Sequence, residues 1–117
     1  MAIVTWVPDD LLGTAGAAVA PTRNGSLSIS DSYRFLNDGK VVLLAEKSGA
    51  GACTATVVTP ATLRGLAVAD PTYTVPATTG DVACGPFDPA TCNDSSGYCS
   101  VTFSEITGLT AAVLRLP

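Results

Sequence analysis

Apolar and polar residues alternate in short runs along most of the chain. The clearest run is residues 98–106, where every second residue is apolar: Cys99, Val101 and Phe103. A period of two is typical of a β-strand with one buried face. Residues 109–116 repeat the pattern, and turn residues separate such runs about every 8–12 positions. The pattern therefore predicts about eight short strands and no helix.

The stretch of residues 31–60 forms the centre of the predicted fold. The run Val-Val-Leu-Leu at residues 41–44 is too short for a helix and too apolar for an exposed strand, so it predicts a buried strand. The preceding Asn-Asp-Gly at residues 37–39 is a strong turn signal. Residues 53–59 are rich in β-branched residues and end at Pro60. Together these runs predict a β-meander.

Length and composition indicate one globular domain. The chain has 117 residues, of which 47% are hydrophobic and 14% charged, the opposite of a disordered chain. We expect an all-β fold, a single β-sandwich or jelly-roll-like domain, formed by residues 26–117. Residues 1–25 differ in composition and are predicted to form an extended N-terminal arm. Its single tryptophan, Trp6, is expected either in the core of the body or in a contact with a neighbour.

The charge pattern argues against several classes of partner. The net charge is −4, and the six cations are spread without a cluster. Nucleic acid and anionic membranes are therefore not expected as partners. No apolar run approaches the roughly 20 residues that a membrane span needs. The N-terminus has no basic region before its apolar residues, so either the protein is made and kept in a cytosol or a signal was removed before Met1, and we expect the first.

The four cysteines raise the question of a structural site. Their spacing lacks tight pairs and the chain has no histidine, so a metal site is not expected. If Asp94–Gly97 formed a four-residue hairpin loop, Cys92 would face Cys99. That pairing would leave Cys53 with Cys84. The alternative is four reduced, buried thiols, which cytosolic synthesis favours.

Catalytic chemistry has little support in the sequence. Without histidine there is no ordinary Ser-His or Cys-His nucleophile. Acidic residues such as Asp31 and Asp38 fall at predicted turns, where they are typical turn residues. We therefore expect no enzyme activity, no catalytic residue, no metal and no cofactor.

Three segments resemble a known family. They are SYRFLNDGKVVLLAEKSGAGACTATVVTP, GLAVADPTYTVPATTGDVACGPF and NDSSGYCSVTFSEITGLTAAVLRL, which together span about residues 32–116. They are similar to small virion proteins of tailed bacteriophages, especially phages of actinobacterial hosts, which are encoded near the major capsid protein. The motifs are strand ends and turns, and the four cysteines depart from the family pattern.

The resemblance implies a virion structural protein. The expected role is capsid decoration, with many copies on the outer surface of the head after synthesis in the host cytoplasm. The expected partners are the major capsid protein and the chain itself, as a homotrimer. Apolar residues of the arm are the expected contacts with the capsid or a neighbouring subunit: Ile3, Val4, Trp6, Val7, Leu11 and Leu12.

Two other roles stay open from the sequence. One is a β-sandwich that binds carbohydrate or a host surface through Tyr33, Tyr73 and Tyr98. The other is a head-tail connector or tail protein, which would form a ring. Copy number per particle separates these roles from decoration.

Overall fold

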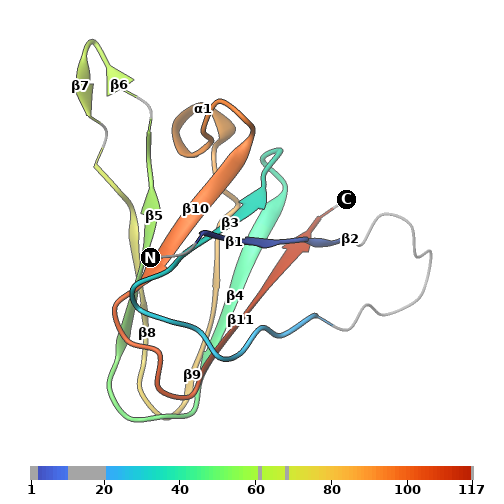
Figure 1. Cartoon of the computed structure of the whole chain (residues 1–117), viewed down its shortest axis with the longest axis vertical. Helices are drawn as coiled ribbons and strands as arrows, with labels where there is room; N and C mark the ends of the chain where they lie inside the picture. The colour runs from blue at the N-terminus through green and yellow to red at the C-terminus, as the bar shows by residue number, and fades with distance from the viewer. Residues whose placement is uncertain (1–2, 11–20, 61, 68, 117) are drawn as a thin grey trace.

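Two β-sheets pack face to face in the computed structural model, which describes residues 3–10, 21–60, 62–67 and 69–116 (Figure 1). Sheet A has five strands, in the order β1 (Ile3–Trp6), β3 (Ser32–Leu36), β10 (Tyr98–Phe103), β5 (Cys53–Val58) and β8 (Thr72–Val75). Sheet B has four strands, in the order β2 (Asp9–Asp10), β11 (Leu109–Arg115), β4 (Val41–Lys47) and β9 (Gly80–Cys84). The predicted all-β sandwich is confirmed.

The predicted inward faces are also confirmed. In β10 the burial alternates, with Cys99, Val101 and Phe103 buried. In β11, Leu109, Ala111 and Val113 are buried in the same way. These side chains meet those of the facing sheet in one core, because every second residue of a strand points to the same side.

The predicted β-meander is wrong. The strands β3, β4 and β5 follow one another in sequence but alternate between the sheets, and β4 pairs with β11 and β9 instead. The Asn-Asp-Gly turn at residues 37–39 is present, but it carries the chain from sheet A to sheet B. A turn sequence fixes the reversal of the chain and does not fix which strands form hydrogen bonds.

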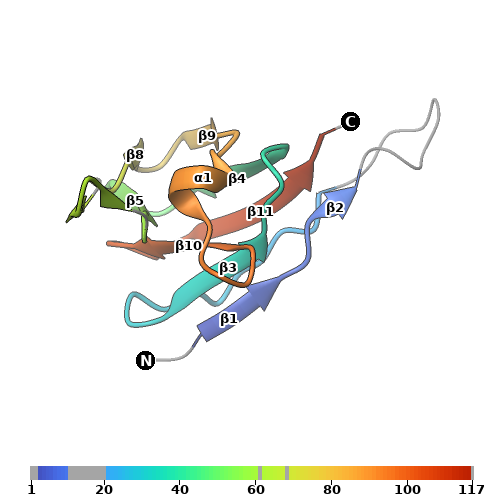
Figure 2. The same ribbon diagram turned by 90° about the horizontal axis from the view of Figure 1, so that it is seen from above.

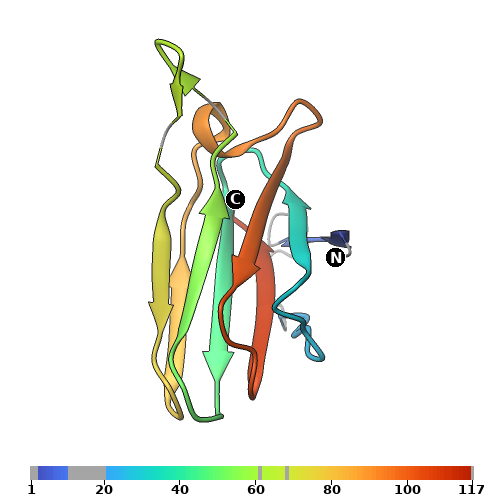
Figure 3. The same cartoon turned by 60° about the vertical axis from the view of Figure 1, so that its left-hand side comes forward.

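Two shorter elements lie outside the sheets. The helix α1 (Pro89–Cys92) is one turn long and was not predicted; its N-cap Asp88 accepts a hydrogen bond from the Ala90 amide at 2.9 Å. Strands β6 (Thr62–Leu63) and β7 (Leu66–Ala67) form a small hairpin that projects beyond the body (Figures 1 and 3). The alternating run at residues 26–30 is not a strand.

The described part of the N-terminal arm belongs to the sandwich. Strand β1 pairs in parallel with β3, and β2 pairs in parallel with β11, so the arm crosses from one sheet to the other along one edge (Figure 2). Trp6 is 7% exposed, and its ring stacks on Tyr33 with centroids 4.7 Å apart. Of the two environments expected for Trp6, the structure therefore has the core of the body.

One charged side chain lies inside the core. Lys47, the last residue of β4, is 1% exposed. Its ammonium donates hydrogen bonds to the carbonyl oxygens of Thr107 and Ala50. The aliphatic stem fills the end of the core while the charge is satisfied by backbone dipoles, which is how a buried lysine is tolerated.

Candidate functional site

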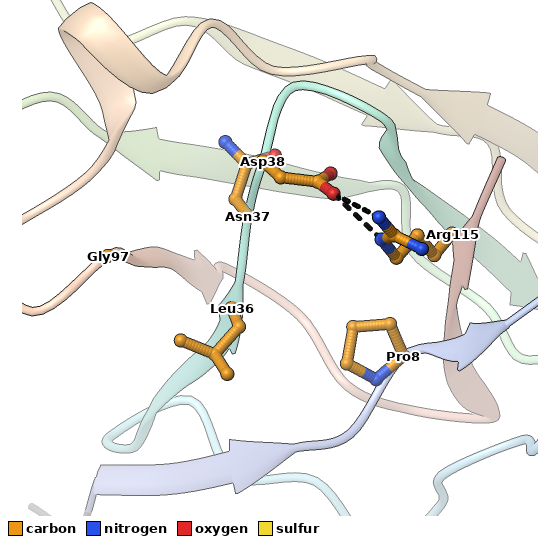
Figure 4. Close-up of a pocket in the computed structure, with 6 residues that line it drawn as sticks. All are labelled: Pro8, Leu36, Asn37, Asp38, Gly97 and Arg115. Atoms are coloured by element: carbon orange, nitrogen blue, oxygen red, sulfur yellow. Dashed lines mark hydrogen bonds and ion pairs between the residues drawn. The ribbon is translucent and has the colours of Figure 1, made fainter. Parts of the chain in front are cut away.

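A hollow of about 420 Å³ lies where the arm passes from sheet A to sheet B (Figure 4). We call it the edge hollow, and residues from four segments line it: Pro8, Leu36, Asn37, Asp38, Gly97 and Arg115. Pro8 lies between β1 and β2, while Leu36 ends β3. The apolar side chains of Leu36 and Pro8 lie on one side of the hollow, and an ion pair closes the other side.

The ion pair joins Asp38 and Arg115. Two guanidinium nitrogens, Nε and Nη2, each lie 2.7 Å from Asp38 Oδ2. The hydrogen bond from Arg115 is the main reason that the pKa of the Asp38 carboxyl lies below its ordinary value. Both side chains are partly exposed, so the pair contributes little to stability in water. It does neutralise the two charges and fixes the turn against the end of β11.

Hydrogen bonds fix the position of Asn37, which lines the edge hollow. Its side-chain amide donates to the Phe87 carbonyl at 3.1 Å and to Asn93 Oδ1 at 2.8 Å. Its backbone N–H donates to the Gly97 carbonyl at 3.0 Å. Asn37, which is 6% exposed, therefore links its own turn to the segment from Phe87 to Gly97.

Exposed apolar side chains flank the hollow. Val7 is 83% exposed and Leu36 is 55% exposed. Val7 directly follows Trp6, and Leu36 directly follows Phe35, the residue that the parallel register places beside Trp6. Ile3, at the start of β1, is 63% exposed. An edge strand with exposed apolar side chains beside a hollow is typical of a protein-docking surface.

The structure divides the predicted contact residues into three groups. Ile3 and Val7 point into solvent and are available for contact. Val4 and Trp6 pack on the core of their own body. Leu11 and Leu12 lie outside the described residues. The strand period explains the division, since alternate residues of β1 face opposite sides.

Sequence reasoning missed Leu36, Asp38 and Arg115 as neighbours. Leu36 had one usable signal, because it is an apolar residue in the outward register of an alternating strand. The Asp38–Arg115 contact spans 77 residues and depends on sheet pairing, which no local pattern reports.

All four cysteines are buried free thiols. The predicted hairpin register is wrong by one residue: Asn93, not Cys92, lies opposite Cys99. The Cys92 and Cys99 thiols nevertheless lie near enough for Cys92 to influence the pKa of Cys99. Burial, with smaller contributions from Cys92, raises the pKa of Cys99 to about 12. Cys53 and Cys84, the other predicted pair, lie on different sheets.

The tyrosines do not gather on the surface. Tyr33 is buried beside Trp6, and Tyr73 packs on Phe87 with centroids 6.3 Å apart. The third, Tyr98, carries the Arg34 guanidinium 4.1 Å above its ring centroid. A flat aromatic platform of the kind that stacks on sugar rings is therefore not formed by these three residues.

The described residues form neither a metal site nor a membrane-spanning helix. They contain no group of three or more acidic, cysteine or histidine side chains arranged to hold a metal ion. No helix among them has the length and apolar character needed to span a bilayer. Every deeply buried side-chain nitrogen or oxygen among them has a hydrogen-bond partner.

Comparison of the chain with family models, with curated proteins and with solved structures gave no match.

Proposed function

We propose that this protein is a virion structural protein that decorates the head of a tailed bacteriophage, with the major capsid protein as its partner. Support comes from the resemblance of residues 32–116 to small head-associated phage proteins and from the sandwich fold. The observation that carries the proposal is the exposed apolar edge of Ile3, Val7 and Leu36 beside the edge hollow.

This edge suits attachment to a protein shell. Among the described residues no strand lies beyond β1 in sheet A, so its backbone can pair with an added strand. Val7 and Leu36 would then be covered by the partner, which removes apolar surface from water. A decorating protein binds in many copies, so each contact can be modest while the array holds firmly.

Electron microscopy of phage particles labelled with an antibody against this protein tests the location. Decoration predicts label spread evenly over the head, in hundreds of copies. Label only at the neck or tail would replace decoration by a connector or tail role, and particles without label would overturn the virion assignment.

Attachment to heads that lack the protein tests the proposed surface. Val7→Asp and Leu36→Asp should each abolish attachment, because each places a carboxylate in the covered edge. Leu66→Asp is the matched control, since Leu66 is 73% exposed on the projecting hairpin. Equal attachment of all three variants would exclude the edge as the contact while leaving the microscopy result standing.

A further inference from the structure

The outward faces of the two sheets differ in chemistry at their centres, although Ile3, Leu36 and Val58 also point outward from sheet A. The outward face of sheet A is rich in hydroxyl side chains: Thr5, Ser32, Thr54, Thr56, Thr72, Thr74, Ser100 and Thr102. The outward face of sheet B carries aliphatic side chains, which we call the β4 face: Val42, Leu44, Ala83, Leu114 and Leu116. An antiparallel sheet that faces water normally has polar residues on that side.

Register places these aliphatic residues in one continuous patch. Val42 lies opposite Leu114, and Leu44 lies opposite Ala83 on the other side of β4. Leu116 continues the ladder, because its N–H donates to the Lys40 carbonyl at 2.7 Å. Ala83 is exposed and the four larger residues are half-buried. Such a patch on the outside of a small sandwich marks an interaction surface.

Charges are found at opposite ends of the β4 face. Lys40 precedes β4 in its outward register, and Val42, Leu44 and Glu46 follow in the strand, so a cation begins the row and an anion ends it. At the anionic end Glu46 lies directly opposite Asp81 of β9. Carboxylates in that position repel each other unless a cation lies near. Arg23 reaches Glu46 at 3.7 Å, which leaves the pair with one excess negative charge.

We propose that two copies of this chain pair through their β4 faces about a two-fold axis perpendicular to the strands. This symmetry places β4 of one copy over β4 of the other in the opposite direction. Lys40 of each copy therefore lies over Glu46 of the other copy. Val42 of one copy then lies over Leu44 of its partner, and the aliphatic patch is covered. The outward row is self-complementary in this arrangement, as an isologous interface requires.

A second copy is the favoured partner because the outward row is complementary to the same row in the opposite direction, with each cation facing an anion. The two lysines supply the cations that the Glu46–Asp81 pairs lack. Asp9, which lies opposite Leu114 at the margin, already accepts hydrogen bonds from Thr22 at 2.6 and 3.0 Å, so it needs no cation from the partner. The pairing does not rest on a virion role, and it leaves the edge hollow open on each copy.

Sedimentation of the whole chain from about 1 μM to about 1 mM tests the pairing. We expect a species of twice the 11.8 kDa mass of the chain. Leu44→Asp should give monomers that are still folded, which circular dichroism would show. Thr56→Asp, on the outward face of sheet A, is the matched control and should leave the dimer intact. A wild-type chain that is monomeric throughout, or a trimer, overturns the proposal.

A charge exchange gives a second, independent test. Lys40→Glu and Glu46→Lys should each weaken the dimer at least about tenfold, because the two-fold axis repeats the repulsion. The double variant restores opposite charges and should recover most of the affinity. A double variant as weak as the single ones would show that these residues do not meet, and would overturn the proposed axis. Capsid attachment by variants that stay monomeric keeps this outcome separate from the proposed function.

Discussion

Asn37 and Asn93 bond to each other in both directions. The Asn37 amide donates to Asn93 Oδ1 at 2.8 Å, and the Asn93 amide donates to the Asn37 carbonyl oxygen at 2.6 Å. The two residues are 56 positions apart, so the pair closes the end of the sandwich at which the edge hollow lies.

Asn37→Ala should lower the free energy of unfolding by about 2–3 kcal/mol, because it leaves the Phe87 carbonyl and Asn93 without their donor. Asn37→Asp keeps the acceptor used by the Gly39 amide, but it removes both donors and places a buried carboxylate against two acceptors, so its loss should be at least as large. Urea denaturation measures both. A loss below about 0.5 kcal/mol for either variant would contradict a structural role for this network.

Lys47→Met tests the buried ammonium. The methionine keeps the apolar stem but leaves two buried carbonyl oxygens, those of Thr107 and Ala50, without their donor. We expect a loss of about 1–3 kcal/mol in the free energy of unfolding. Arg64→Met, at an exposed position between β6 and β7, is the control and should change stability by less than about 0.5 kcal/mol. Equal effects of the two changes would mean that the ammonium is not satisfied in the core.

Trp6→Ala should destabilise the whole domain by about 3–5 kcal/mol, since Trp6 fills the core beside Tyr33 and Phe103. Val7→Ala, one residue on, should be close to neutral because Val7 is exposed. Thermal or urea unfolding distinguishes the two. If Trp6→Ala unfolds like the wild type, the arm does not belong to the folded body. Point changes at exposed arm residues are therefore better tests of attachment than removal of the arm.

Alkaline pH should destabilise the protein through its thiols. Burial raises the pKa of Cys99 from its ordinary 9.0 to about 12 and raises that of Cys84 in the same direction. Below pH 9 the thiols are protonated in both the folded and the unfolded state. Above pH 9 the unfolded state ionises first, so stability falls between about pH 9 and about pH 12. Cys99→Ala should flatten that decline. A decline of the same slope in the variant would assign it to other groups.

Mild oxidation tests the Cys92–Cys99 bond, which stays a prediction. The proximity of the two thiols should allow a copper-phenanthroline oxidant to remove two hydrogens, and peptide mass spectrometry would then find the two cysteines linked. Failure of the oxidant to link the two cysteines in the folded protein would mean that the Cys92 and Cys99 sulfur atoms do not come within bonding distance.

Local sequence patterns predicted which side of each strand is buried, but they did not predict which strands pair. Alternation alone identified Val101 and Phe103 as core residues. It could not identify Arg115 as the partner of Asp38, because that contact follows from the pairing of β11 with β4. The burial of Lys47 was not predicted, because a charged residue is normally exposed. Its burial depends on the loop carbonyl oxygens that accept hydrogen bonds from its ammonium.

The parallel pairing of the arm has a consequence for synthesis of the protein. Strand β2 is synthesised well before its partner β11, near Leu114. Strand β1 likewise waits for β3, which begins at Ser32. Neither strand can therefore reach its final place until its later partner has been made. A nascent chain that stops before β11 leaves both β2 and β4 unpaired on that side, which exposes strand edges to other chains.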